Sequence, residues 1–236
     1  MLNQLLQQVE KAQKGAFFTI GLTGSVAVGK STLADQLAVA LRKVGRTVEV
    51  LSTDAFLKNN ERLHQEGIFD EKGFPKSYDL HSMEDFIRNF KDGKDRQETA
   101  VYSQTLADII PNEKRTINRP DVLILEGVVA LQLPTDLLDL TVFLEADMQD
   151  VKDWYLARNL LATVKSANRP DSWRAQYARL PLFDFYKLAM GVWERTNQKN
   201  YDDYILKTRE KSDWIVSVDY FHQVQSVLAG PRLKEA

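Results

Sequence analysis

The sequence predicts an α/β fold in which a mainly parallel, doubly wound sheet carries helices on both faces. Three observations support this prediction: short apolar runs recur, helical patterns separate them, and a glycine-rich loop joins the first run to the first helix. Continuous apolar strands that alternate with helices are typical of a parallel sheet that is covered on both faces. The predicted strands are "AFFTIGL" (16–22), "VEVLST" (48–53), "DVLILE" (121–126), "LTVFLE" (140–145) and "DWIVSV" (213–218).

Apolar residues at helical spacing predict the helices between these strands. The N-terminal segment is expected to form a short amphipathic helix through Leu2, Leu5, Leu6 and Val9. A second helix follows the glycine-rich loop and ends in a left-handed turn at Gly45. Its buried stripe comprises Leu33, Leu37, Leu41 and Val44. A third helix is expected to begin at Ser82, with Asp85 as its capping-box partner. Its buried face comprises Met83, Phe86, Ile87 and Phe90.

The length of 236 residues suits one domain spanning 1–236, with no repeat, low-complexity tract or linker. Two long stretches, about 55–81 and about 155–205, are richer in polar and aromatic residues than the strands. Long loops in compact domains are usually functional. We therefore interpret the first stretch as a substrate-binding insertion and the second as a helical lid.

Composition excludes several classes of function. With 31 basic and 33 acidic residues the net charge is near -2, so no field gathers nucleic acid without sequence preference. The absence of cysteine excludes disulfides, thiolate metal sites and a catalytic thiol. The N-terminus lacks the pattern of a signal peptide, and no segment approaches the roughly 18 uninterrupted apolar residues of a membrane span. We expect a soluble cytoplasmic protein with neither a nucleic-acid nor a membrane partner.

The loop "GLTGSVAVGKST" (21–32) matches the phosphate-binding pattern Gly-x-x-x-x-Gly-Lys-Ser between a predicted strand and a predicted helix. Its glycines let successive N–H groups point at phosphate oxygens, and the helix N-terminus adds partial positive charge. The alternative is a chance glycine-rich turn, which the strand and helix flanks disfavour. The pattern predicts a P-loop NTPase fold that binds ATP through Gly24, Ser25, Val26, Ala27, Val28, Gly29, Lys30, Ser31 and Thr32.

Within this loop, Lys30 would reach the β- and γ-phosphates and Ser31 would ligate Mg²⁺. Ligands of open parallel sheets bind beyond the carboxyl ends of the strands, where Asp54 and Glu126 follow two predicted strands. We assign Asp54 as the general base for an acceptor hydroxyl and Glu126 to the metal site. Taken singly, either acid could equally be a helix cap or a loop residue.

The class of phosphoryl chemistry follows from what accompanies the loop. The guanine-recognition string "NKxD" of GTPases does not occur, and the chain is too short to show the coupling element of a motor. A metabolic kinase fits better, because a mobile lid would keep water away from the transferred phosphate.

Several strings occur together in one unbroken order between about residues 16 and 225. They are "GSVAVGKST" (24–32), "STDAFL" (52–57), "KGFPKSYD" (72–79), "VYSQ" (101–104), "DVLILEG" (121–127), "WYLAR" (154–158) and "KTREKS" (207–212). With them the chain resembles the bacterial type I pantothenate kinase family, within the wider phosphoribulokinase and uridine kinase group. The resemblance implies transfer of the ATP γ-phosphate to the primary hydroxyl of pantothenate, the first step toward coenzyme A, by a homodimer.

The resemblance also implies roles for individual residues. Asp54 would be the base, Arg158 would steady the transferring phosphate, and His222 would lie beside adenine. Pantothenate would be bound by Tyr102, Gln104, Tyr155 and Asn197, of which Gln104 stands where the family has histidine. Without the resemblance, the tyrosines could be core aromatics, Asn197 a helix cap and Arg158 a residue of a solvated helix face.

Other departures from the family concern the acceptor and regulation. Asp35 replaces an arginine that the family uses on inhibitory coenzyme A, which implies weaker feedback inhibition. Phenylalanines that line the pantothenate tail pocket in the family are replaced by Asn159, Ala162 and Arg174. Because this pocket would be more polar, a related kinase for another small hydroxyl compound, such as a nucleoside or sugar, remains an alternative. A nucleotide-binding regulatory module is a further alternative, which the retention of both Asp54 and Glu126 disfavours.

Overall fold

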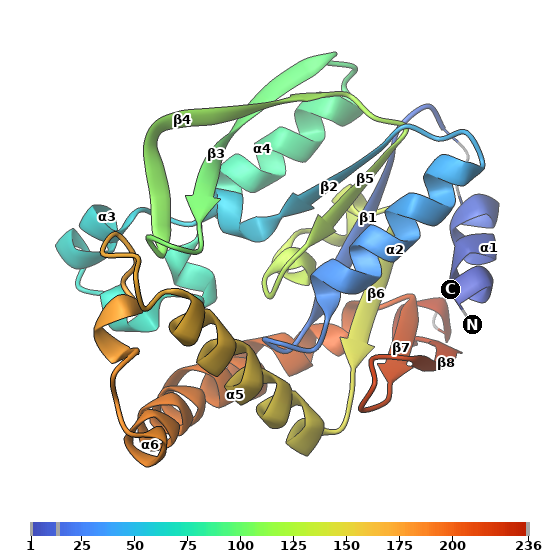
Figure 1. The fold of residues 1–236 in the computed structure, drawn as a ribbon. Coiled ribbons are helices and arrows are strands. Elements are labelled where there is room, and N and C mark those ends of the chain that lie inside the picture. Colours follow the sequence, from blue (N-terminus) through green and yellow to red (C-terminus); the bar gives the residue numbers. More distant parts are fainter. Residues whose placement is uncertain (1, 13–14, 235–236) are drawn as a thin grey trace.

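The structure is a computed structural model that describes residues 2–12 and 15–234. Its centre is a six-stranded sheet in the order β2-β5-β1-β6-β7-β8 (Figure 1). The first five of these strands are parallel, and β8 runs antiparallel to β7. This confirms the predicted mainly parallel α/β sheet. The strands are β1 (Phe18–Gly24), β2 (Val48–Ser52), β5 (Val122–Glu126), β6 (Leu140–Glu145), β7 (Trp214–Val218) and β8 (Val224–Ala229).

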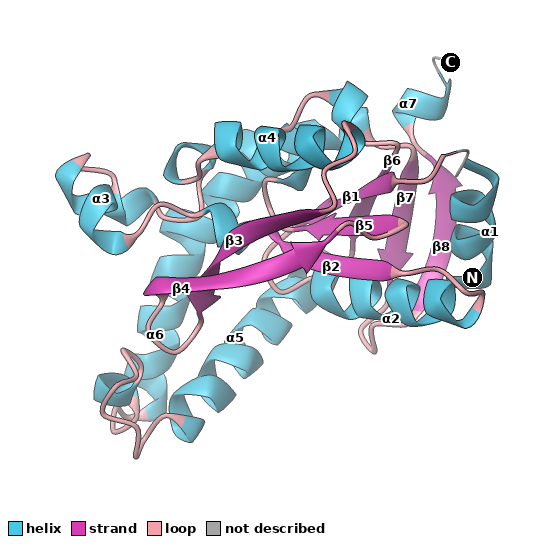
Figure 2. Cartoon of the chain, turned by 90° about the horizontal axis from the view of Figure 1, so that it is seen from above, coloured by secondary structure: helices cyan, strands magenta, loops and turns pink. Residues whose placement is uncertain are grey.

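Helices cover both faces of this sheet (Figure 2). The described α-helices are α1 (Leu2–Ala12), α2 (Lys30–Lys43), α3 (Asn60–Gln65), α4 (Leu80–Lys91), α5 (Met148–Lys165), α6 (Leu182–Val192) and α7 (Pro231–Lys234). The side chains of β5 alternate between two cores. Val122 and Ile124 belong to the core shared with α1, α2 and α5, whereas Leu123 and Leu125 belong to the core shared with α4. Burial on both faces explains why the strand sequence is continuously apolar.

The predicted strands all form, but two further β-structures were not predicted. One is the antiparallel edge strand β8. The other is a separate hairpin of β3 (Arg96–Ser103) and β4 (Asp108–Asn118), whose strands are largely polar and only partly buried. The hairpin lies on the β2 side of the molecule (Figure 2). There Arg115 of β4 forms an ion pair with Glu49 and donates a hydrogen bond to the carbonyl of Val50.

The first two predicted helices form, with one error in the second stripe. The α1 residues Leu5 and Val9 are buried. The α2 helix ends before Gly45, whose φ of 86° is left-handed as expected. Val44, however, is 49% exposed because it is the C-cap and lies beyond the last buried turn.

The predicted start of the third helix is wrong. Helix α4 begins at Leu80, and Asp79 is its N-cap, since the Asp79 carboxylate accepts a hydrogen bond of 3.0 Å from the backbone N–H of Ser82. Aspartate and serine are comparable N-cap residues, so residue type alone did not distinguish Asp79 from the proposed Ser82 and Asp85 pair. The predicted buried face is confirmed for Met83, Phe86, Ile87 and Phe90.

The two stretches interpreted as an insertion and a lid contain short helical elements. Residues 53–79 hold three 3₁₀ turns and α3. Helices α5 and α6 lie side by side and project from the sheet in both views (Figures 1 and 2). After α6 the chain continues through two π-helical turns, Trp193–Gln198 and Tyr201–Ile205, and a 3₁₀ segment, Leu206–Lys211. The fully buried Trp193 packs its ring 5.1 Å from that of Tyr155 on α5.

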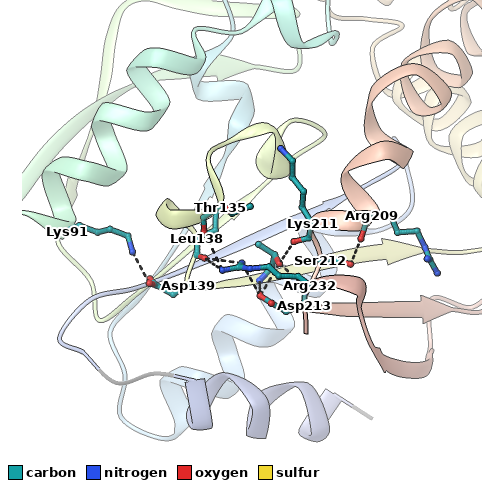
Figure 3. A network of polar contacts seen from close by, with 10 residues as sticks. Lys91, Thr135, Leu138, Asp139, Arg209, Lys211, Ser212, Asp213 and Arg232 are labelled. Carbon is teal, nitrogen blue, oxygen red and sulfur yellow. Dashed lines mark hydrogen bonds and ion pairs between the residues drawn. The ribbon is translucent and has the colours of Figure 1, made fainter. Parts of the chain in front are cut away.

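A polar network holds the amino ends of the strands together (Figure 3). The Asp213 carboxylate accepts hydrogen bonds from the N–H and hydroxyl of Thr141 and forms an ion pair of 3.2 Å with Arg232. Beside it, Asp139 accepts from the N–H of Thr19 and pairs with Lys91 at 2.8 Å. These acids precede β7 and β6, so the network joins strand starts to helices at the end of the sheet opposite the glycine-rich loop.

Candidate active site

The glycine-rich loop connects β1 to α2, as predicted. A Cβ atom on Gly24 would lie 2.3 Å from the carbonyl oxygen of Leu144, so only glycine allows the loop to approach β6 this closely. Gly29 is the N-cap of α2 with a left-handed φ of 100°, and no side chain caps the helix. The first N–H groups of α2 therefore face the loop without an intrahelical acceptor, which is the geometry of an anion site.

Lys30 folds back over this loop. Its ammonium donates to the carbonyl oxygens of Gly24 (3.2 Å) and Ser25 (2.8 Å). Burial lowers the pKa of Lys30 to about 8, which the carboxylate of Glu126 opposes and the charge of Arg158 reinforces. The hydroxyl of Ser25 is buried without a hydrogen-bond partner in the described part of the chain. A phosphate oxygen would give the Ser25 hydroxyl the acceptor that it lacks among the described residues, and it would attract the Lys30 ammonium by its charge.

Ser31 and Glu126 come together at the end of β5. The Ser31 hydroxyl donates a hydrogen bond of 3.0 Å to Oε1 of Glu126, which is 7% exposed. Burial raises the pKa of Glu126, whereas Lys30 and the Ser31 hydroxyl oppose the shift. Hydroxyl and carboxylate oxygens are ligands that Mg²⁺ accepts, and Mg²⁺ usually keeps several waters and binds substrate phosphates as well. The residues present therefore fit the predicted metal.

Asp54 lies in the 3₁₀ turn Thr53–Phe56, directly after β2. Strand register places Ser52 beside Glu126, so the two acids share the carboxyl edge of the sheet. The Asp54 carboxylate accepts a 3.3 Å hydrogen bond from the Gln104 side chain and a 3.5 Å contact from the hydroxyl of Tyr78. Burial raises the pKa of Asp54, although the charge of Lys30 opposes this shift. A carboxylate whose pKa is raised can take a proton from an acceptor hydroxyl more readily.

Helix α5 presents Tyr155, Arg158 and Asn159 along one side. Burial raises the pKa of Tyr155 and the nearby side chain of Asn197 opposes this shift, so the first π-helical turn brings together two predicted substrate residues. Isolated π-helical turns occur frequently at functional sites. Arg158 keeps exposed surface although protein atoms surround its guanidinium, and this desolvation lowers its pKa while Tyr155 and Asp54 oppose the shift.

Tyr102 lies on β3 of the hairpin, and Gln104 follows that strand. Burial raises the pKa of Tyr102, and the negative charge of Asp54 adds to the shift, so the ring lies within the influence of the proposed base. His222 lies on the other side of the phosphate loop. Its Nδ1 is 3.1 Å from the position of a Cβ on Gly29, and its ring lies 3.9 Å from that of Trp154. The structure thus gathers Tyr102 near Asp54 and places His222 against the loop.

Arg174 was marked from the sequence only as a polar replacement in the acceptor-tail pocket, and two residues near Asp54 were given no role. Tyr78 contacts its carboxylate, and Lys72 lies with its ammonium 5.3 Å from the centre of the Tyr102 ring. Both belong to the sequence string at 72–79, and this string was the only feature of the sequence that could have indicated them. Arg174 donates a 3.1 Å hydrogen bond to the carbonyl of Gln104. It follows no strand and shows no periodicity, so only its departure from the family marked it.

Comparison with known proteins decides the family. The profile of the phosphoribulokinase / uridine kinase family matches residues 19–161. The chain is 37% identical to the pantothenate kinase of Yersinia enterocolitica over 224 residues, covering 89% of this chain and 71% of that protein. It is 37% identical to the pantothenate kinase of Enterococcus faecalis over 219 residues, with the same coverage. The chain belongs to the pantothenate kinase family.

Solved structures support the same fold. A protein of Silicibacter sp. TM1040, described as a candidate fructose transport system kinase, superposes with a TM-score of 0.70. It is 22% identical and covers 86% of this pantothenate kinase family member and 92% of its own chain. In residues 2–12 and 15–234 of this kinase, the structure contains no helix that combines the length and the apolar character of a membrane span.

Proposed function

We propose that this kinase transfers the γ-phosphate of ATP to the primary hydroxyl of pantothenate, the first step toward coenzyme A. The observation that carries the proposal is the position of Asp54, which lies between the phosphate loop and a group of polar side chains that could hold an acceptor. The relatives at 37% identity that bear the name pantothenate kinase support the choice of acceptor.

In this mechanism Asp54 accepts the proton of the acceptor hydroxyl while that oxygen attacks the γ-phosphorus, whose bond to the β–γ bridging oxygen breaks to release ADP. The loop N–H groups and Lys30 hold the β- and γ-phosphates, and Arg158 stabilises the charge on the transferred group. Ser31 and Glu126 would hold Mg²⁺, which neutralises phosphate charge when bound. We assign His222 to the adenine ring, which is supported by its Nδ1 lying 3.1 Å from the position of a Cβ on Gly29.

The acceptor would lie between the hairpin and α5. Tyr102 and Gln104 are on the hairpin side, and Tyr155 and Asn197 are on the side of the helical segment. We assign residues 55–81 as the substrate-binding insertion and 155–205 as the lid of a single kinase domain. The side-chain amide of Asn200 donates a 2.7 Å hydrogen bond to the carbonyl of Gly73, which joins these two segments. A closed lid would direct the phosphate to the acceptor and not to water.

A kinase for another small hydroxyl compound is the second candidate, because Arg174 and Asn159 make the far end of the site polar. ATP consumption with pantothenate, uridine and ribulose 5-phosphate offered singly separates the two candidates. Turnover with pantothenate supports the proposal. No turnover with pantothenate at millimolar concentration, together with turnover of another acceptor, would favour the second candidate.

Replacing Asp54 by Asn tests the assignment of the base. We expect ATP binding to persist while phosphate transfer falls by about two orders of magnitude or more, because the amide cannot accept the proton. Unchanged transfer in this variant would show that another group takes the proton.

We also propose that the protein acts in the cytoplasm as a homodimer and does not bind nucleic acid. The near-neutral balance of 31 basic and 33 acidic residues supports the last point. Light scattering after gel filtration tests the dimer, for which a mass near twice 27.0 kDa is expected.

A further inference from the structure

Arg174 has an incomplete set of partners. One terminal nitrogen donates 3.1 Å to the carbonyl of Gln104, and the other lies 3.5 Å from the side-chain oxygen of Asn159. The guanidinium also stacks on Trp173, with 4.3 Å between its carbon and the ring centre. Its Nε is buried without a hydrogen-bond partner in the described part of the chain. A buried donor without a partner costs free energy, so its retention calls for an explanation.

The charges around Arg174 also leave room for an anionic partner. The groups that influence its ionisation are Arg158, Tyr102 and Tyr155, and no carboxylate is among them. The Asp54 carboxylate offsets the charge of Arg158, but Arg174 meets the repulsion of Arg158 with no carboxylate of the described chain to offset it. A planar carboxylate can accept two parallel hydrogen bonds from a guanidinium, and it would also offset this repulsion.

The contacts also fix where such an anion would lie relative to the chemistry. The side chain of Gln104 reaches the Asp54 carboxylate at 3.3 Å, and its backbone carbonyl reaches Arg174 at 3.1 Å. Gln104 alone thus separates the proposed base Asp54 from Arg174, whose guanidinium has an N–H without a hydrogen-bond partner within the residues that the structure describes. A small acceptor with a hydroxyl at one end and an anion at the other could span the two.

We propose that Arg174 binds a carboxylate at the end of the acceptor remote from its reacting hydroxyl, so that this kinase selects acceptors with an anionic tail. The inference rests on the proposed function, because it concerns the same acceptor site. It differs from a purely structural role of Arg174, in which the arginine would only tie its segment to the hairpin through Gln104.

The test compares acceptors that differ only in the tail. Pantothenate and pantothenol share the primary hydroxyl, but pantothenol carries an alcohol in place of the carboxylate. D-glycerate and glycerol form a second pair. For the wild type we expect kcat/KM to be about tenfold to hundredfold higher for the acid of whichever pair is turned over, since hydrogen bonds to a charged group are strong.

In Arg174→Gln this preference should fall to about twofold, mainly through a higher KM for the acid. Arg174→Lys should keep part of the preference. The matched control is Arg179→Gln, which removes the same charge from an exposed position of the same segment and should leave the preference intact. Circular dichroism establishes that the variants fold, and a ratio of two acceptors is insensitive to the fraction of active enzyme.

Each outcome decides the matter. Turnover of glycerate but not pantothenate, with loss of preference in Arg174→Gln, overturns the proposed function and supports the anionic tail. Equal kcat/KM for acid and alcohol in the wild type, or turnover of uridine alone, overturns the inference while leaving kinase activity in place. An unchanged preference in Arg174→Gln also overturns it. If no acceptor is turned over, calorimetry decides, and absence of pantothenate and glycerate binding overturns it.

Discussion

The hydroxyl of Ser31 donates a 3.0 Å hydrogen bond to the carboxylate of Glu126, across 95 positions of the chain. The contact links the first turn of α2 to the last residue of β5. It therefore depends on the native placement of the phosphate loop against the sheet. Because both groups are oxygen donors, the contact marks where the metal requirement of the reaction can be tested.

Glu126→Gln should raise the Mg²⁺ concentration needed for half-maximal activity and lower kcat/KM for ATP by about hundredfold, since a neutral amide binds Mg²⁺ more weakly. Magnesium titrations of the steady-state rate measure this. Glu145→Gln is the control, because Glu145 also ends a strand but pairs with Arg209 at 2.9 Å. A wild-type Mg²⁺ dependence in Glu126→Gln would remove Glu126 from the metal site.

Asp54 is expected to destabilise the fold at neutral pH. Burial raises its pKa in the folded state, so the folded protein binds more protons than the unfolded chain once pH exceeds the unfolded value near 3.8. Stability therefore falls as pH rises from that value through the folded pKa. Asp54→Asn removes this cost and should raise Tm by about 2–4 °C at pH 7, equivalent to about 1 kcal/mol.

Thermal melts between pH 4 and pH 8 measure this effect, and the gain in the variant should widen as pH rises above 4 and level off above the folded pKa of Asp54. The control is Asp171→Asn, which changes an exposed carboxylate between α5 and α6. A lower Tm for Asp54→Asn than for the wild type across this range would contradict the assignment of a buried, costly charge.

Lys30 should take up a proton when nucleotide binds at alkaline pH. Its pKa of about 8 means that much of the ammonium is deprotonated above pH 8 before binding, whereas a triphosphate favours the charged form. Calorimetry of ATP binding at pH 8.5 in buffers of different ionisation enthalpy reports the protons exchanged. We expect net uptake in the wild type and none in Lys30→Met. Equal uptake in both would assign the proton to another group.

Asn200 is expected to hold the "KGFPKSYD" loop against the helical segment. Its side chain is 3% exposed and donates 2.7 Å to the carbonyl of Gly73, which Asn200→Ala would leave without this donor. We expect a loss of about 1–3 kcal/mol of stability and faster hydrogen exchange at residues 72–79. Lys199→Ala, at an exposed neighbouring position, should change neither. Wild-type exchange in Asn200→Ala would show that other contacts hold the loop.

The core of the sheet could be predicted because burial on both faces forces its strands to be continuously apolar. The hairpin and β8 could not be predicted because their side chains are largely exposed. In β8 only Val227 is fully buried, so its sequence resembles a loop. The start of α4 was misplaced because the serine at 82 donates its N–H to the cap and is not the cap itself.

The same distinction applies to the site. Asp54 and Glu126 could be located because the carboxyl ends of parallel strands meet at one edge. Lys72 and Arg174 reach this edge through tertiary packing of irregular segments, and no local periodicity encodes such an approach. Their positions required the fold.

The polar network of Asp213, Arg232 and Thr141 has a practical consequence for protein engineering. It lies at the amino ends of the strands, while the proposed catalytic residues lie at the carboxyl ends. Changes at well-separated positions usually add independently. Substitutions that raise thermal stability at the amino ends of the strands should therefore not interfere with substitutions that raise turnover at the carboxyl ends.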